Sequence, residues 1–159
     1  MNKLWLSIGC LVVCSTCLLR TTVMANGTDD AITLKDLRET IIKVRTMSGP
    51  SMARTNAAEH LSQLTRQIEP KKVDDKMLRD MVSLLNIPDD SVRLRVAGAM
   101  GNLGPRAKMA VPALLRVIRE TDCPPKIETG VTLSGTALLA LKRIGVEPPP
   151  PRDCGKKSD

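Results

Sequence analysis

The stretch that decides the fold is Asn86 to Arg119, NIPDDSVRLRVAGAMGNLGPRAKMAVPALLRVIR. It predicts two short amphipathic helices joined by a corner at Gly104-Pro105. Pro88 restricts the residue before it to extended geometry, and the acidic and hydroxyl side chains that follow can accept from the first helix amides. Apolar residues then recur at helical spacing in both segments. Neither helix can bury its apolar stripe alone, so further helices are expected on both sides.

Proline and glycine positions refine this prediction. Pro112 fits the second helix only within its first turn, where the missing N–H is not needed. Gly98 and Gly101 each lower helix propensity by about 1 kcal/mol relative to Ala. We therefore expect these two glycines where another helix approaches closely.

The flanking sequence repeats the same pattern at offsets near 40 residues. Leu37-Arg38-Glu39 matches Leu78-Arg79-Asp80, and Met100 matches Leu141, each 41 positions apart. Such a period is typical of two-helix repeats. Six helices are predicted, at about 33–47, 51–68, 74–85, 90–103, 111–119 and 133–144, in the order B-A-B-A-B-A.

The central residues also carry a family resemblance. The pattern Asp89-Asp90-x-Val92-Arg93, followed by Met100-Gly101-x-Leu103-Gly104 and Ala110-Val111-Pro112-Ala113-Leu114-Leu115, resembles a HEAT-type repeat of the armadillo-like α-solenoids. The resemblance covers about thirty residues. It implies an inter-repeat polar ladder made by Asp89 or Asp90 with Arg93, and a binding scaffold with no chemistry of its own. The predicted fold is all-α, a short right-handed α-solenoid of about three HEAT-like repeats, with an irregular six-helix bundle as the alternative.

The first 25 residues have the pattern of a signal peptide. Lys3 precedes an apolar run from Leu4 to Leu19, and Val23-Met24-Ala25 places small residues before a cut ahead of Asn26. The run is shorter than the roughly 20 residues that span a membrane. A retained anchor is one alternative, and a lipoprotein is another because Cys10, Cys14 and Cys17 lie in the run. Cleavage after Ala25 predicts a secreted or periplasmic protein of the cell envelope, with no membrane span in the mature chain.

The remaining chain divides into three parts. Residues 26–32 form a polar leader expected to be disordered, 33–146 the helical repeat domain, and 147–159 a Pro-rich flexible tail. Cys123 and Cys154 are the cysteines left after cleavage, and in an exported chain they predict one disulfide, with two unpaired thiols as the alternative. No metal or cofactor site is predicted, because Cys123 and Cys154 form no CxxC motif in the chain that remains after cleavage, and His60 is the single histidine.

Charge and aromatic content restrict the function. The chain has 24 basic and 17 acidic residues, a formal net charge of +7 at pH 7, and Trp5 is its single aromatic residue. A mature chain without aromatic rings lacks the stacking platforms of sugar and single-strand nucleic-acid sites. It also lacks an aromatic clamp for a DNA-repair or lyase enzyme on this scaffold. His60 and Ser134 have no partner pattern for catalysis, so no enzymatic activity is predicted.

Two binding functions are predicted instead. In HEAT-like solenoids the B helices line the concave face, and here their solvent sides carry a column of six cations. The leading hypothesis is an exported scaffold that binds another protein through this face; the alternative is a basic binder of an anionic polymer or surface, such as nucleic acid, wall polymer or lipid headgroups. An ordinary solvated face with ion pairs along each helix is the third interpretation, since acidic residues interrupt the column. The six cations are Lys35, Arg38, Lys76, Arg79, Arg116 and Arg119.

Overall fold

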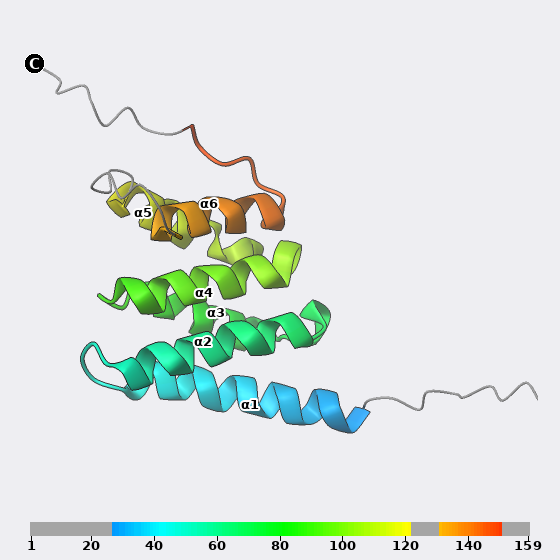
Figure 1. The fold of residues 1–159 in the computed structure, drawn as a ribbon. Coiled ribbons are helices and arrows are strands. Elements are labelled where there is room, and N and C mark those ends of the chain that lie inside the picture. Colours follow the sequence, from blue (N-terminus) through cyan, green and yellow to red (C-terminus); the bar gives the residue numbers. More distant parts are fainter. Residues whose placement is uncertain (1–26, 122–130, 151–159) are drawn as a thin grey trace, which may run out of the picture.

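The computed structural model describes residues 27–121 and 131–150. These residues form six α-helices and two 3-10 helices, and this part of the chain contains no strand (Figure 1). The protein is therefore all-α, as predicted. The elements are α1 (Gly27–Thr46), α2 (Met52–Gln67), η1 (Pro70–Lys72), α3 (Asp75–Leu84), α4 (Asp90–Leu103), η2 (Gly104–Ala110), α5 (Val111–Thr121) and α6 (Leu133–Ile144).

Side-chain caps begin most of these helices where the sequence predicts a start. Ser51, Asp74, Asp89 and Thr132 each have extended backbone and accept a hydrogen bond from an amide of the first turn. Such caps satisfy amides that have no partner within the helix. Gly145 ends α6 in the left-handed conformation that glycine adopts without strain.

The structure differs from the prediction at two boundaries. α1 begins at Gly27, so residues 27–32 of the expected disordered leader are helical. No proline or second glycine separates Gly27 from the apolar stripe of this helix, so nothing in the backbone stops it from extending. The Gly-Pro corner after α4 is also longer than expected, because the segment Gly104–Ala110, labelled η2, forms two short 3-10 turns that meet at a kink at Ala107 before α5 starts. Pro112 does lie in the first turn of α5, as predicted.

The α-helices form two layers. α2 packs on α4 and α4 on α6, whereas α1 and η2 contact α3 in the second layer. Figure 1 shows α2, α4 and α6 stacked one above another, with α3 and α5 behind them and α1 below α2, where it contacts both α2 and α3. This alternation agrees with the predicted order of helix types. A short solenoid and an irregular bundle share these contacts at this size, so the solenoid stays a prediction.

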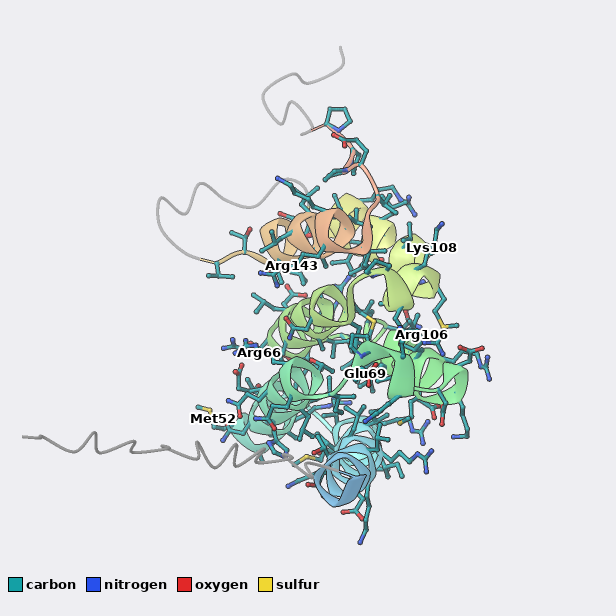
Figure 2. All side chains as sticks on the ribbon, turned by 90° about the vertical axis from the view of Figure 1, so that its right-hand side faces the viewer. Met52, Arg66, Glu69, Arg106, Lys108 and Arg143 are labelled. Atoms are coloured by element: carbon teal, nitrogen blue, oxygen red, sulfur yellow. The ribbon has the colours of Figure 1, made fainter. Side chains whose placement is uncertain are left out.

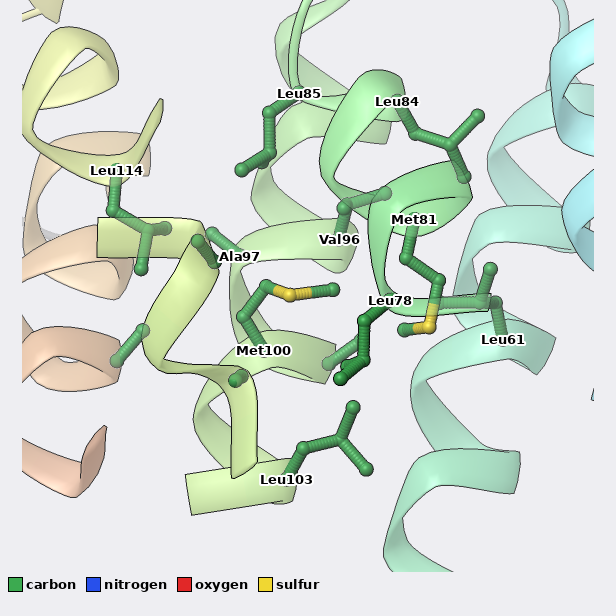
Figure 3. Packing of buried hydrophobic residues seen from close by; sticks show 14 of the residues in the cluster. Leu61, Leu78, Met81, Leu84, Leu85, Val96, Ala97, Met100, Leu103 and Leu114 are labelled. Atoms are coloured by element: carbon green, nitrogen blue, oxygen red, sulfur yellow. The ribbon is translucent and has the colours of Figure 1, made fainter. Parts of the chain in front are cut away.

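An aliphatic core lies between the layers (Figure 3). Leu78 and Met81 of α3 meet Leu61 of α2 and Met100 of α4, and each of the four is fully buried. Leu, Ile, Val, Met and Ala make up the buried apolar side chains of the described residues, as the composition requires. The core is continuous across all six α-helices, because the cluster extends from Leu37 to Ile144.

The two α4 glycines behave differently. A Cβ on Gly101 would lie 3.1 Å from the Cα of Ala140, so α4 and α6 approach closely there, as predicted. A Cβ on Gly98 would find its nearest neighbour at 3.7 Å, the hydroxyl of Ser62, which is an ordinary contact. Close packing of α4 on α6 thus explains why position 101 is a glycine, but it does not explain the glycine at position 98. Separately, none of the described helices is long and apolar enough to cross a membrane.

The predicted signal peptide (1–25), Cys123, Cys154 and residues 151–159 of the predicted tail lie outside the described residues. Cleavage and the disulfide therefore stay predictions.

Candidate partner-binding surface

The six predicted binding cations lie on the three helices of one layer. All six side chains are exposed, and they come in pairs from α1, α3 and α5. We call the solvent side of this layer the odd-helix face, defined by Lys35, Arg38, Lys76, Arg79, Arg116 and Arg119.

Ion pairs connect the first two helices of this face. An Arg38 nitrogen lies 3.0 Å from Asp74 Oδ2, and Arg45 lies 3.2 Å from Asp80 Oδ1. Lys76 Nζ reaches the other oxygen of Asp80 at 2.9 Å. Each arginine belongs to α1 and each aspartate to the start or body of α3, so these pairs fix α1 against α3.

These contacts keep both aspartates ionised. The pKa of Asp74 is lowered by a hydrogen bond from the backbone N–H of Met77 and by the neighbouring Arg38. The pKa of Asp80 is lowered by the hydrogen bond from Lys76, then by the charges of Lys76 and Arg45. Two full negative charges therefore stand among the cations between α1 and α3.

The remaining cations of the odd-helix face divide into paired and free. Lys35 and Arg116 each lie 3.8 Å from a glutamate four residues later on the same helix. Arg79 and Arg119 are exposed and make no ion pair or side-chain hydrogen bond within the described residues. The predicted basic column is therefore a mixed-charge surface, in which four of the six cations have acidic neighbours. The interrupting carboxylates were visible in the sequence, but their pairing across helices was not.

A groove runs between α1 and α3, with a volume of about 370 Å³. Its apolar part is formed by Ile41, Ile42 and Met77, of which Ile42 is 49 % exposed. The ion pairs described above form its walls, because Arg38, Arg45, Asp74, Lys76 and Asp80 also line it. The groove thus combines an apolar floor with fixed charges of both signs.

The predicted polar ladder between repeats is not formed by its predicted residues. Asp89 caps the N-terminus of its own helix, accepting from two backbone N–H groups. Arg93 bonds to Asp90 one turn back at 3.2 Å and to Glu120 of α5. The contacts of Asp89, Asp90 and Arg93 therefore stay within α4 or connect α4 to α5, the next α-helix in the chain.

A different residue links α2, α4 and α6. Asn102 of α4 donates to the Ser62 carbonyl at 3.1 Å and to the Thr65 hydroxyl at 3.2 Å, both on α2. Arg143 of α6 donates to the Asn102 carbonyl oxygen at 3.5 Å. Ser62 and Arg143 lie 40 and 41 positions from Asn102, which is the spacing of the predicted repeat. That predicted spacing was the signal in the sequence from which these contacts could have been found.

Two other pockets are smaller candidates. One, of about 320 Å³, lies between the turn after α3 and α5, where Arg93 and Arg116 flank Glu120. The other, of about 340 Å³, lies between α1 and α2 and includes His60. Thr40 and Lys43 also line the second pocket, and His60 makes no side-chain hydrogen bond within residues 27–121 and 131–150. Within the same ranges, no three His, Cys, Asp or Glu side chains are grouped to hold a metal ion.

Comparison with known proteins gives no relative: no protein-family model matches the chain, and no curated protein or solved structure is significantly similar to it. The HEAT-like resemblance therefore rests on the sequence pattern.

Proposed function

We propose that the chain is an exported, HEAT-like helical scaffold that binds another protein through the odd-helix face and catalyses no reaction. The observation that carries this proposal is the groove between α1 and α3, where half-exposed Ile42 lies among ordered ion pairs. Protein interfaces commonly have an apolar centre with a polar rim, and the groove has this composition. Export rests on the N-terminal sequence.

The fixed position of the groove walls supports a protein partner. Arg45 and Asp80 hold one another across the two helices, and Asp74 also caps α3. Side chains that are already ordered lose less conformational entropy on binding. A scaffold with such a surface can bind without refolding.

The charge of the groove favours a partner of mixed charge over a polyanion. Asp74 and Asp80 are ionised and paired, so a uniformly acidic ligand would meet two carboxylates on the groove walls. A protein segment that carries an apolar side chain and charges of both signs fits this arrangement better.

Replacement of Ile42 tests the proposal. Ile42→Asp would place a charge on the groove floor, and Met52→Asp is the matched control, since Met52 is 77 % exposed and does not line the groove. Each full-chain protein is used to capture partners from a nuclease-treated envelope extract. We expect one defined protein to be recovered with the parent and Met52→Asp but lost with Ile42→Asp. Equal recovery with Ile42→Asp would contradict the assignment of this face.

Export has its own test. The mass of the purified native protein should correspond to residues 26–159 if cleavage follows Ala25. Recovery of the intact chain in the cytoplasmic fraction would overturn export without affecting the assignment of the groove.

A further inference from the structure

A second charged surface lies at the side of the molecule where α2, α4 and α6 end. Figure 2 faces this side and shows Arg66, Arg106, Lys108 and Arg143 spread along the stack of helices. The cations come from the last turns of α2 and α6 and from the two 3-10 helices. We call it the basic edge, defined by Arg66, Lys71, Arg106, Lys108, Lys142 and Arg143.

Most of these cations are free. Arg66, Lys71, Lys108 and Lys142 are exposed and make no ion pair or side-chain hydrogen bond within the described part of the chain. Arg106 and Arg143 are the exceptions, because Arg106 bonds to the Val73 carbonyl and to Asp75, and Arg143 donates to Asn102. The basic edge thus has four unpaired cations, whereas the odd-helix face has two, Arg79 and Arg119.

The carboxylates near the basic edge do not cancel this charge. Glu69 lies 3.8 Å from Lys72, and Asp75 pairs with Arg106 at 2.6 Å. Glu147 follows α6 and is exposed. Two of these three carboxylates already have a cationic partner, so the four free cations keep an excess of positive charge.

Helix dipoles account for part of the basic edge only. Basic residues in the last turn of a helix are favoured by the partial negative charge there. This effect explains the positions of Arg66, Lys142 and Arg143. Lys71 and Lys108 lie in the 3-10 helices, and neither is at the C-terminus of an α-helix. Their charge has no structural partner, so it is available to a ligand.

The cations follow the stacking direction. α2, α4 and α6 are successive neighbours in one layer, and packed helices lie roughly 8–10 Å apart. Cations from the ends of α2 and α6 therefore extend across the stack, and those of η1 and η2 lie beside them, so that together they form a patch (Figure 2). A patch of this kind fits a partner with closely spaced negative charges.

We propose that the basic edge binds the phosphate backbone of a nucleic-acid duplex without reading its bases. Duplex DNA carries one negative charge per roughly 1.7 Å along its axis, so a patch of separate cations finds phosphates at any register. The described residues contain no aromatic side chain that could stack on a base, which leaves the backbone as the point of contact.

A lipid surface fits less well. Lipid-binding surfaces add apolar side chains that enter the headgroup boundary. Of the exposed large apolar residues in the described ranges, Met109 of η2 lies beside basic-edge cations, whereas Met52 and Leu139 lie outside the last turns of α2 and α6. The basic edge shares no residue with the α1–α3 groove, so this proposal can be tested independently of the protein-binding proposal.

The test compares charge reversals on two surfaces. The edge variant combines Lys71→Glu, Lys108→Glu and Lys142→Glu. The control variant combines Lys43→Glu, Arg79→Glu and Arg119→Glu, which also replaces three exposed and unpaired cations but lies elsewhere. Binding of each full chain to a labelled random-sequence DNA duplex of about 20 base pairs is measured by fluorescence anisotropy from about 50 to 200 mM NaCl. Circular dichroism checks that each variant remains helical.

We expect micromolar binding by the parent at low salt that weakens on the order of 100-fold across this range, as four phosphate contacts predict. The edge variant should bind at least about tenfold more weakly at low salt. The slope of its logarithmic binding constant against the logarithm of the salt concentration should be smaller by nearly three, whereas the control keeps most of the parent's slope. Lysine-to-glutamine changes at the same three positions replace the edge variant if charge reversal unfolds it. No binding by the parent, equal losses in both variants, or edge-dependent binding to phosphatidylglycerol vesicles and not to DNA would overturn the proposal.

Discussion

Gly101 of α4 lies against Ala140 of α6 so closely that a Cβ on the glycine would come within 3.1 Å of the alanine Cα and 3.3 Å of its Cβ. The obstacle is backbone, which cannot rotate away as a flexible side chain can. The two helices are the central and last members of their layer, so this contact sets how closely the last helix packs on the rest of the stack.

Gly101→Ala should therefore destabilise the protein. The extra methyl would force α4 and α6 apart, at a cost of about 1–3 kcal/mol that exceeds the gain in helix propensity. Gly98→Ala is the matched control, because its Cβ would meet only ordinary contacts in the same helix. Urea unfolding should show a lower midpoint for Gly101→Ala and an equal or higher one for Gly98→Ala. A stabilised Gly101→Ala variant would contradict the close approach.

Arg54 should stabilise the end of α1 from inside the molecule. Its side chain is buried, and its Nε donates to the Val44 carbonyl at 3.0 Å. Arg54→Ala would leave that carbonyl without its side-chain donor and open space beside α1. We expect a loss of about 1–3 kcal/mol in unfolding free energy. Arg66→Ala, which removes an exposed arginine of the same helix, should change stability by less than about 0.5 kcal/mol.

Asn102 should couple the three helices of its layer. Asn102→Ala removes the donor to Ser62 and Thr65 on α2 and the acceptor for Arg143 on α6. We expect a destabilisation of about 1–2 kcal/mol. In a double-mutant cycle with Thr65→Val, the two effects should be non-additive, because both changes break the same hydrogen bond. Strict additivity would show that the link carries no energy.

The helix positions were predictable because local signals define them. Apolar periodicity marks the buried stripes, and Asp89 precedes its helix as a cap, so both the existence and the alternating layer positions of the six helices follow from the sequence. The start of α1 was placed too late, since Thr33 also has the residue type of a cap and the sequence before it is polar. The position of a helix end depends on the small free-energy difference between helical and non-helical forms of its terminal residues, which local sequence patterns do not resolve.

The candidate site was less predictable, because its contacts join residues far apart in the chain. Exposed cations on the odd-numbered helices were identified correctly, but their neutralisation depends on pairs such as Arg45 with Asp80, which the packing of α1 on α3 creates. Arg93 was assigned to a ladder by resemblance, whereas its distance to α5 is set by how α4 and α5 pack. The basic edge was missed because its cations come from two helix ends and two 3-10 helices, which lie far apart in the chain and which the fold brings to one side of the molecule.

Acid should weaken the contact between α1 and α3. The folded-state pKa of Asp80 lies below its unfolded value, because Lys76 and then Arg45 favour the carboxylate. A lowered pKa stabilises the folded state above about pH 4, and this contribution is lost as the pH falls through the folded pKa. Asp80→Asn should therefore lower the unfolding free energy at pH 7 by less than about 1 kcal/mol, as expected for a largely solvated pair. The difference in unfolding free energy between parent and variant, measured by urea unfolding, should become smaller near pH 2.5 and in about 1 M NaCl. A gap that is equal at both pH values would show that the charge of Asp80 does not stabilise the fold.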